Sequence, residues 1–275
     1  MIEATSNNRA LPMKWLTFAG GERHVQLLQM PMDGENASVD IRLIFENSDD
    51  IMDLLLLVNA LRHQYAKVDI SLTIPYLPYG RQDRVCSPGQ AFSLEVFAQL
   101  INSQQLNRVT TWDCHSEAGL QMLGAENVTP EYVIARSPSL LGQLQAEDAV
   151  LVCPDKGAVK RCRRIQKAFA ITDTVLCEKT RDPSTGKITA TRINRESLEG
   201  KHCVIADDIC DGGYTFIKIA EQLKARGAAS VVLYVTHGIF SKGFDVFNDL
   251  IDVIYTSNSL PHAINDPRLN VIQFS

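Results

Sequence analysis

Short apolar segments alternate with amphipathic segments along most of the chain, and this alternation restricts the possible folds more than any other feature. Apolar runs rich in β-branched residues, such as Val68–Ile74 and Ala149–Cys153, have the length of buried strands. The stretches between them, such as Phe92–Gln104 and Val159–Ala168, have the periodicity of helices. Strands that alternate with helices usually build a largely parallel sheet covered by helices, so we predict an α/β fold.

The opening of the chain departs from this alternation. Lys14–Ala19, Val25–Met30 and Asp40–Phe45 resemble strands separated by turns, with no helix between them, which predicts an antiparallel start. A helix is expected next, capped by Asp49 or Asp50. Its predicted apolar face consists of Ile51, Leu54, Leu55, Val58 and Leu61.

The order of strands and helices resumes after Ala135–Pro138. A chain of 275 residues is about the right length for two modest α/β domains, and we place them at residues 1–136 and 137–275. The remaining predicted elements are a strand at Arg108–Trp112, a helix near Leu140, strands at Ile171–Cys177, Lys201–Ala206, Ser230–Thr236 and Ile251–Tyr255, and a helix from Thr215.

Composition excludes several classes of protein. The longest apolar run, Leu54–Val58, is too short to cross a membrane, and the polar segment Met1–Arg9 does not resemble a secretory signal, so we expect a cytoplasmic protein. The seven cysteines contain no C-x-x-C pair and are expected to be reduced. A net charge of −5 does not favour nucleic acid as a partner.

The strongest chemical signal is an apolar strand, Val204–Ala206, that leads into two aspartates, a glycine loop and a helix. Backbone N–H groups at such a helix start suit a phosphate, while Asp207 and Asp208 can accept hydrogen bonds from the vicinal hydroxyls of a ribose. A second interpretation stays open from these residues alone: Asp211 is a helix N-cap, and the two aspartates are merely solvated.

This segment resembles the ribose-phosphate binding motif of type I phosphoribosyltransferases. Ile74–Arg84, which reads IPYLPYGRQDR, narrows the resemblance to ribose-phosphate pyrophosphokinases, whose arginine and glutamine at this point contact ATP. Further matches follow in family order: Asp33-Gly34-Glu35, Asp113-Cys114-His115, Pro154-Asp155-Lys156-Gly157, Lys179-Thr180-Arg181 and Thr236-His237-Gly238. The resemblance implies two phosphoribosyltransferase-like domains, each a largely parallel sheet flanked by helices, and a homo-oligomer built from dimers, up to a hexamer.

The resemblance also implies a role for each matching residue. The ATP-binding residues would be Asp33, Glu35, Arg81, Gln82, Asp83 and His115, with Mg²⁺ held by His115 and Asp155. The ribose-phosphate site would be Asp207, Asp208, Asp211, Gly212, Gly213 and Thr215. Lys179 and Arg181 would be the catalytic cations on a hairpin, although a solvated basic hairpin is the better explanation when the residues are taken alone.

The implied reaction transfers the β,γ-pyrophosphate of ATP to the anomeric hydroxyl of ribose 5-phosphate. The sequence departs from the family where D-T-x-G-T becomes Asp211–Thr215, which has two glycines and a tyrosine and suggests ADP-ribose as an alternative acceptor. Val85–Gln90 lacks the usual basic residues, which argues against regulation by phosphate or ADP. A non-catalytic protein that regulates a synthetase is the alternative from another functional class.

Overall fold

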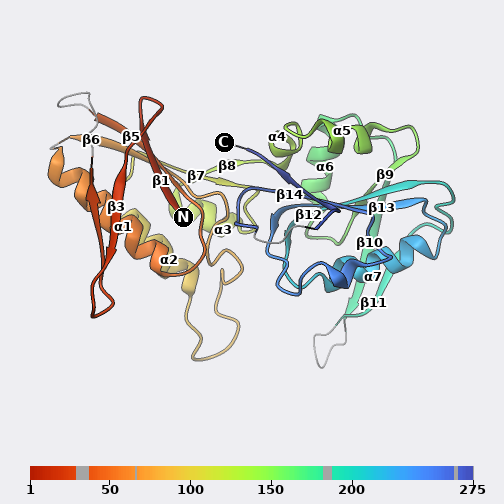
Figure 1. The fold of residues 1–275 in the computed structure, drawn as a ribbon. Helices are drawn as coiled ribbons and strands as arrows, with labels where there is room; N and C mark the ends of the chain where they lie inside the picture. The colour runs from red at the N-terminus through yellow and green to blue at the C-terminus, as the bar shows by residue number, and fades with distance from the viewer. Residues whose placement is uncertain (29–36, 66, 182–187, 263–265, 275) are drawn as a thin grey trace. The chain divides into compact units, whose positions relative to one another are not determined.

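The computed structural model describes the chain except for residues 29–36, 66, 182–187, 263–265 and 275. It divides into two compact units, each with its own sheet (Figure 1). The first contains Met1–Val128 and Ser259–Pro261, and the second contains Thr129–Asn258 and His262–Ser275. The predicted α/β class is confirmed, because both sheets are rich in parallel strand pairs and carry helices.

The main sheet of the first unit has six strands in the order β2-β1-β5-β6-β7-β8. Its strands are β1 (Ile2–Ser6), β2 (Arg9–Ala10), β5 (Ala37–Leu43), β6 (Val68–Thr73), β7 (Arg108–Trp112) and β8 (Glu126–Val128). Strands β5 to β8 are parallel, whereas β1 pairs antiparallel with β2 and β5. A separate antiparallel pair, β3 (Met13–Thr17) and β4 (Arg23–Leu27), confirms the predicted antiparallel start.

Helix α1 (Asp49–Gln64) begins where predicted, but its N-cap is Ser48. Asp50 instead accepts hydrogen bonds from the backbone N–H groups of Glu46 and Asn47, which fixes the preceding turn. Leu55, predicted to lie in the core, is only partly buried, whereas Leu57 is fully buried. The core also receives α2 (Ser93–Asn102), and α3 (Glu117–Leu123) is the next helix in the described part of this unit.

The second sheet has seven strands in the order β11-β10-β9-β12-β13-β14-β15. Its strands are β9 (Ala149–Cys153), β10 (Thr174–Arg181), β11 (Ile188–Ile193), β12 (His202–Cys210), β13 (Ser230–Gly238), β14 (Val253–Ser257) and β15 (Leu269–Ile272). All neighbouring pairs are parallel except β10 and β11, which form an antiparallel hairpin. The central strands are buried on both faces, which explains their continuous apolar sequences.

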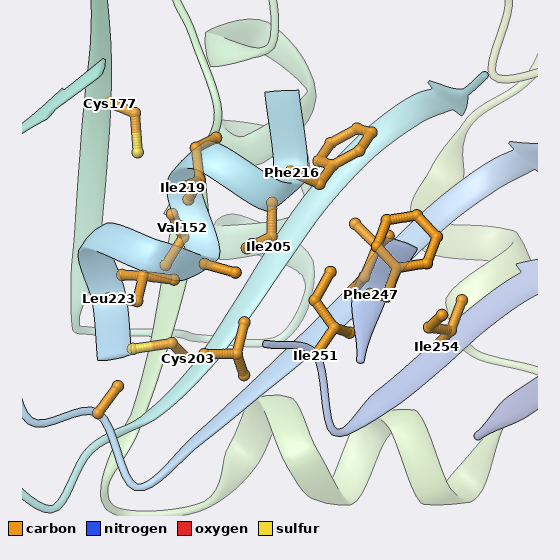
Figure 2. Packing of buried hydrophobic residues seen from close by; sticks show 14 of the residues in the cluster. Val152, Cys177, Cys203, Ile205, Phe216, Ile219, Leu223, Phe247, Ile251 and Ile254 are labelled. Atoms are coloured by element: carbon orange, nitrogen blue, oxygen red, sulfur yellow. The ribbon is translucent and has the colours of Figure 1, made fainter. Parts of the chain in front are cut away.

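Helices cover both faces of this sheet (Figure 1). Helix α7 (Tyr214–Lys224) packs Phe216, Ile219 and Leu223 against one face, where Cys203 and Ile205 point from β12 (Figure 2). The alternate β12 residues face the helices α4 (Pro130–Ile134), α5 (Pro138–Gln145) and α6 (Val159–Ala168). The 3₁₀-helix η1 (Asp245–Phe247) adds its phenylalanine to the α7 side.

None of the helices in the described ranges has the length and apolar character needed to cross a membrane.

Candidate active site

The carboxyl end of β12 carries two aspartates that share one arginine. Arg161, from α6, donates from Nη1 to Oδ1 of Asp207 at 3.1 Å, and its Nη2 lies 3.0 Å from Oδ2 of Asp208. The backbone N–H of Asp208 also donates to Oδ1 of Asp207 at 3.0 Å. The pair is therefore held in a fixed orientation, which argues against two merely solvated side chains.

Ionisation of both carboxylates in this pair is unfavourable. Burial raises the pKa of Asp207 well above its ordinary value, and the neighbouring charge of Asp208 raises it further. The guanidinium of Arg161 acts in the opposite direction. Ionised carboxylates kept close together at a strand end are costly for folding, and such costs are concentrated at functional sites.

The glycine loop that follows β12 leads directly into α7. Gly213 is the N-cap residue in a left-handed conformation with φ of 79°, and a glycine has no side chain with which to cap the first turn. Asp211, the alternative N-cap, instead accepts a hydrogen bond from the Ser241 hydroxyl at 2.6 Å. The N–H groups at the start of α7, where Thr215 lies in the first turn, can therefore receive an anion.

Gly213→Ala is expected to destabilise the protein. A Cβ atom at this position would lie 2.6 Å from two ring carbons of the fully buried Phe247, in addition to the cost of the left-handed backbone. Overpacking and backbone strain together predict a loss of about 2–4 kcal/mol in the free energy of unfolding, measured by urea denaturation.

Gly212→Ala is the matched control, because a Cβ there would make an ordinary contact of 3.4 Å with Cγ of Lys242. Equal unfolding midpoints for the two variants would contradict this account of the loop.

Asp155 lies in the turn between β9 and α6. Its Oδ1 accepts hydrogen bonds from the backbone N–H groups of Gly157 at 2.9 Å and Ala158 at 3.1 Å. Its charge contributes to the raised pKa of Asp207, and β9 and β12 are neighbours in the sheet. The structure therefore brings Asp155 to the same edge of the sheet as the two aspartates.

Lys179 and Arg181 lie at the end of β10, in the hairpin that the sequence predicts. Lys179 is paired with Thr191 and Arg181 with Ile188, and a register irregularity falls between Thr180 and Arg181. Residues 182–187, at the turn of this hairpin, lie outside the described residues. The backbone thus places both cations next to the turn.

The first unit brings together another group of predicted residues. The loop after β6 and the turn after β7 meet where the Ser116 hydroxyl donates to Oδ2 of Asp83 at 3.1 Å. A hydrogen bond from Arg84 lowers the pKa of Asp83, with smaller contributions from Ser116 and the charge of His115. Arg81 and Gln82 lie in the loop after β6, and His115 lies in the turn after β7. All three are exposed, and β6 and β7 are neighbours in the sheet.

Asp33 and Glu35 lie outside the described residues. Sequence reasoning missed Arg161, Ser116 and Ser241, which orient Asp207, Asp83 and Asp211. Ser116 and Ser241 follow quoted motifs closely in the chain, whereas Arg161 is one of several cations in α6.

Two family models match the chain. Residues 1–104 match the N-terminal domain of ribose phosphate pyrophosphokinase, and residues 136–267 match the phosphoribosyl transferase domain. A crystal structure of phosphoribosylpyrophosphate synthetase from Mycobacterium smegmatis superposes with a TM-score of 0.80, covering 96% of this chain and 86% of that chain. Its sequence identity is 23%, so this likeness concerns the fold, and it confirms the predicted pair of phosphoribosyltransferase-like domains.

Curated relatives have a higher sequence identity to this chain than that crystal structure has. The ribose-phosphate pyrophosphokinase of Marinomonas sp. is 33% identical over 238 residues, which is 83% of this chain and 73% of the relative. That of Vibrio cholerae is 32% identical over 249 residues, 88% of this chain and 77% of the relative. With this identity over most of both sequences, the chain belongs to the ribose-phosphate pyrophosphokinase family.

Proposed function

We propose that the protein transfers the β,γ-pyrophosphate group of ATP to the anomeric hydroxyl of ribose 5-phosphate, which yields phosphoribosyl pyrophosphate and AMP. The observation that carries this proposal is the arrangement at the end of β12, where two oriented carboxylates precede a glycine loop and a helix whose N-cap residue is glycine. A ribose phosphate needs acceptors for its hydroxyls and donors for its phosphate, and this segment supplies both.

In the second unit, Asp207 and Asp208 would accept hydrogen bonds from the ribose hydroxyls. The acceptor phosphate would lie against Gly212, Gly213 and Thr215 at the start of α7, with Asp211 bound to Ser241 to shape the loop. In the first unit, Arg81, Gln82, Asp83 and His115 would bind ATP, joined by Asp33 and Glu35 from a neighbouring copy of the chain. These roles come from the family motifs and are compatible with the described geometry.

The reaction needs no covalent intermediate on the protein. The anomeric oxygen attacks the β-phosphorus of ATP, the bond from that phosphorus to the α,β-bridging oxygen breaks, and the anomeric hydroxyl loses its proton. AMP leaves with the bridging oxygen. Lys179 and Arg181 would neutralise the negative charge that develops on the transferred group and on AMP.

Magnesium fits the residues proposed for it. Among the described residues, no group of three or more His, Cys, Asp or Glu side chains is arranged to hold a metal. Mg²⁺ commonly keeps its waters and binds one or two protein side chains together with nucleotide phosphates, which suits single ligands such as Asp155 and His115. The ion would neutralise charge on the ATP phosphates. Asp155 is already oriented for this role by two backbone N–H groups.

We also propose that the protein is a homo-oligomer built from dimers and that it acts in the cytoplasm. The family relationship supports the assembly. The cysteines of the chain are free, as is usual for proteins of reducing compartments, which favours the proposed location.

AMP formation from ATP and Mg²⁺ tests this function, with ribose 5-phosphate and ADP-ribose offered separately. We expect ribose 5-phosphate to react faster. ADP-ribose belongs in the test because Tyr214, at the start of α7, is 56% exposed, and an exposed ring can stack on a substituent beyond the phosphate. Reaction with ADP-ribose alone would overturn the proposed acceptor, and binding of ATP without reaction of either compound would favour a regulatory protein.

A further inference from the structure

Two cysteines of the second unit form a buried thiol pair that the proposed reaction does not use. Cys153 is the last residue of β9, and Cys162 lies in the middle of α6, with 6% and 7% of their surfaces exposed. Both belong to the same buried cluster, and the interaction between the two thiols lowers the pKa of Cys153 and raises the pKa of Cys162. The remaining cysteines in the described residues are Cys86, which is exposed, Cys114, which is half-buried, and Cys177, Cys203 and Cys210, which are buried.

A recess gives small molecules access to this pair. It has a volume of about 200 Å³, is partly open, and is lined by residues of β9, β10 and α6 that include both cysteines and Arg163. A water molecule occupies about 30 Å³ in the liquid, so the recess can admit hydrogen peroxide. Both cysteines are thus buried in the fold and still line a recess that an oxidant can enter.

We propose that Cys153 and Cys162 form a reversible disulfide on exposure to a peroxide, and that this bond weakens binding of the sugar acceptor. One thiol is oxidised by hydrogen peroxide to a sulfenic acid, with release of one water. The second thiol then attacks that sulfur, the S–S bond forms, and the sulfenic oxygen leaves as a second water. Two electrons pass from the two thiols to one peroxide, and reduction by a dithiol reverses the step.

The pair is connected to the acceptor site through its neighbours in the chain. Arg161 directly precedes Cys162 and holds Asp207 and Asp208 at 3.1 and 3.0 Å. The Cys153 thiol donates to the backbone carbonyl of Asp155 at 3.2 Å, and that bond is lost when the disulfide forms. Drawing α6 towards β9 therefore moves the arginine that orients the two aspartates.

The test uses the full-length, fully reduced protein treated with hydrogen peroxide. Mass spectrometry of the intact protein should show the loss of two hydrogens, and a tryptic digest without reductant should contain a peptide pair linked through Cys153 and Cys162. Cys153→Ser and Cys162→Ser should abolish this linked pair, whereas Cys86→Ser should retain it. A linkage between other cysteines, or oxidation without linkage, would overturn the proposal.

The kinetic part of the proposal rests on the proposed function. Oxidation should raise KM for ribose 5-phosphate about tenfold, within the usual range for coupled sites, and leave KM for ATP unchanged. Cys162→Ser should be insensitive to peroxide. A disulfide with an unchanged acceptor KM would overturn the coupling. An inactive reduced protein that still forms the linked peptide would instead count against the proposed function, because the mass measurement does not depend on activity.

Discussion

Lys179→Ala and Arg181→Ala are each expected to lower kcat by about 10²–10³-fold while the protein stays folded, since removing one donor that stabilises developing charge has an effect of this size. Both residues lie at the turn end of the β10–β11 hairpin, where a cation can approach the phosphates of a bound nucleotide. Steady-state AMP formation at saturating ATP and acceptor measures the effect.

Arg192→Ala is the matched control for this pair. Arg192 is exposed on the same hairpin, but it is paired with Glu178, further from the turn. Its replacement should leave kcat within about threefold of wild type, as expected for a surface substitution that contacts no substrate. Normal turnover of both the Lys179 and Arg181 variants would show that the hairpin is merely a solvated basic surface.

Asp207→Asn is expected to lower turnover at limiting acceptor by at least about 100-fold and to raise the melting temperature at neutral pH by about 2–4 °C. The amide keeps an oxygen that can accept from Arg161, but the repulsion with Asp208 disappears. Activity and stability therefore change in opposite directions, as expected for a residue kept for function.

The direction in which the stability gain of Asp207→Asn changes with pH can also be predicted. Since the folded-state pKa of Asp207 is raised, its contribution to stability is fully present below the ordinary carboxyl pKa and is lost as the pH rises through the folded-state value. The stability gain of Asp207→Asn should therefore grow with pH in melting curves from mildly acidic to neutral buffer.

Asp266→Asn is a control in which the same kind of substitution should lower stability at neutral pH. Hydrogen bonds from Arg268 lower the pKa of Asp266, so the ionised carboxylate stabilises the fold above its ordinary pKa and the variant should lose stability there. A neutral-pH loss of stability in both variants would contradict the described electrostatics of the aspartate pair.

The fold could be predicted wherever burial produced a clear apolar pattern. Strands β7 and β9 and helix α6 have the predicted ends, because their apolar residues are bounded by polar turns. Strand β12 continues four residues beyond the predicted end at Ala206, since two aspartates interrupt its apolar pattern while its backbone pairing with β13 persists. The sequence pattern does not predict β1 or β15, because both strands are short and β15 lies at the edge of its sheet.

The sequence predicts the site residues that belong to contiguous motifs. It does not predict residues that reach the site only because distant segments pack together. Arg161 illustrates the limit. Helix α6 contains Lys160, Arg161, Arg163 and Arg164, and no spacing in the sequence distinguishes one from another. Only the packing of the helix directs Arg161 to Asp207, while Arg164 reaches Glu131 at 3.3 Å. Contacts of this kind depend on tertiary structure, which a motif does not encode.

The fate of each phosphorus atom of ATP tests the central claim most directly. ATP labelled in turn at the α, β or γ phosphorus is incubated with the protein, Mg²⁺ and ribose 5-phosphate, and the labelled products are separated. Transfer of a pyrophosphate group predicts that the β and γ labels appear together on the sugar and that the α label remains in AMP. Transfer of the γ label alone, with release of ADP, would contradict the account and identify an ordinary phosphoryl kinase.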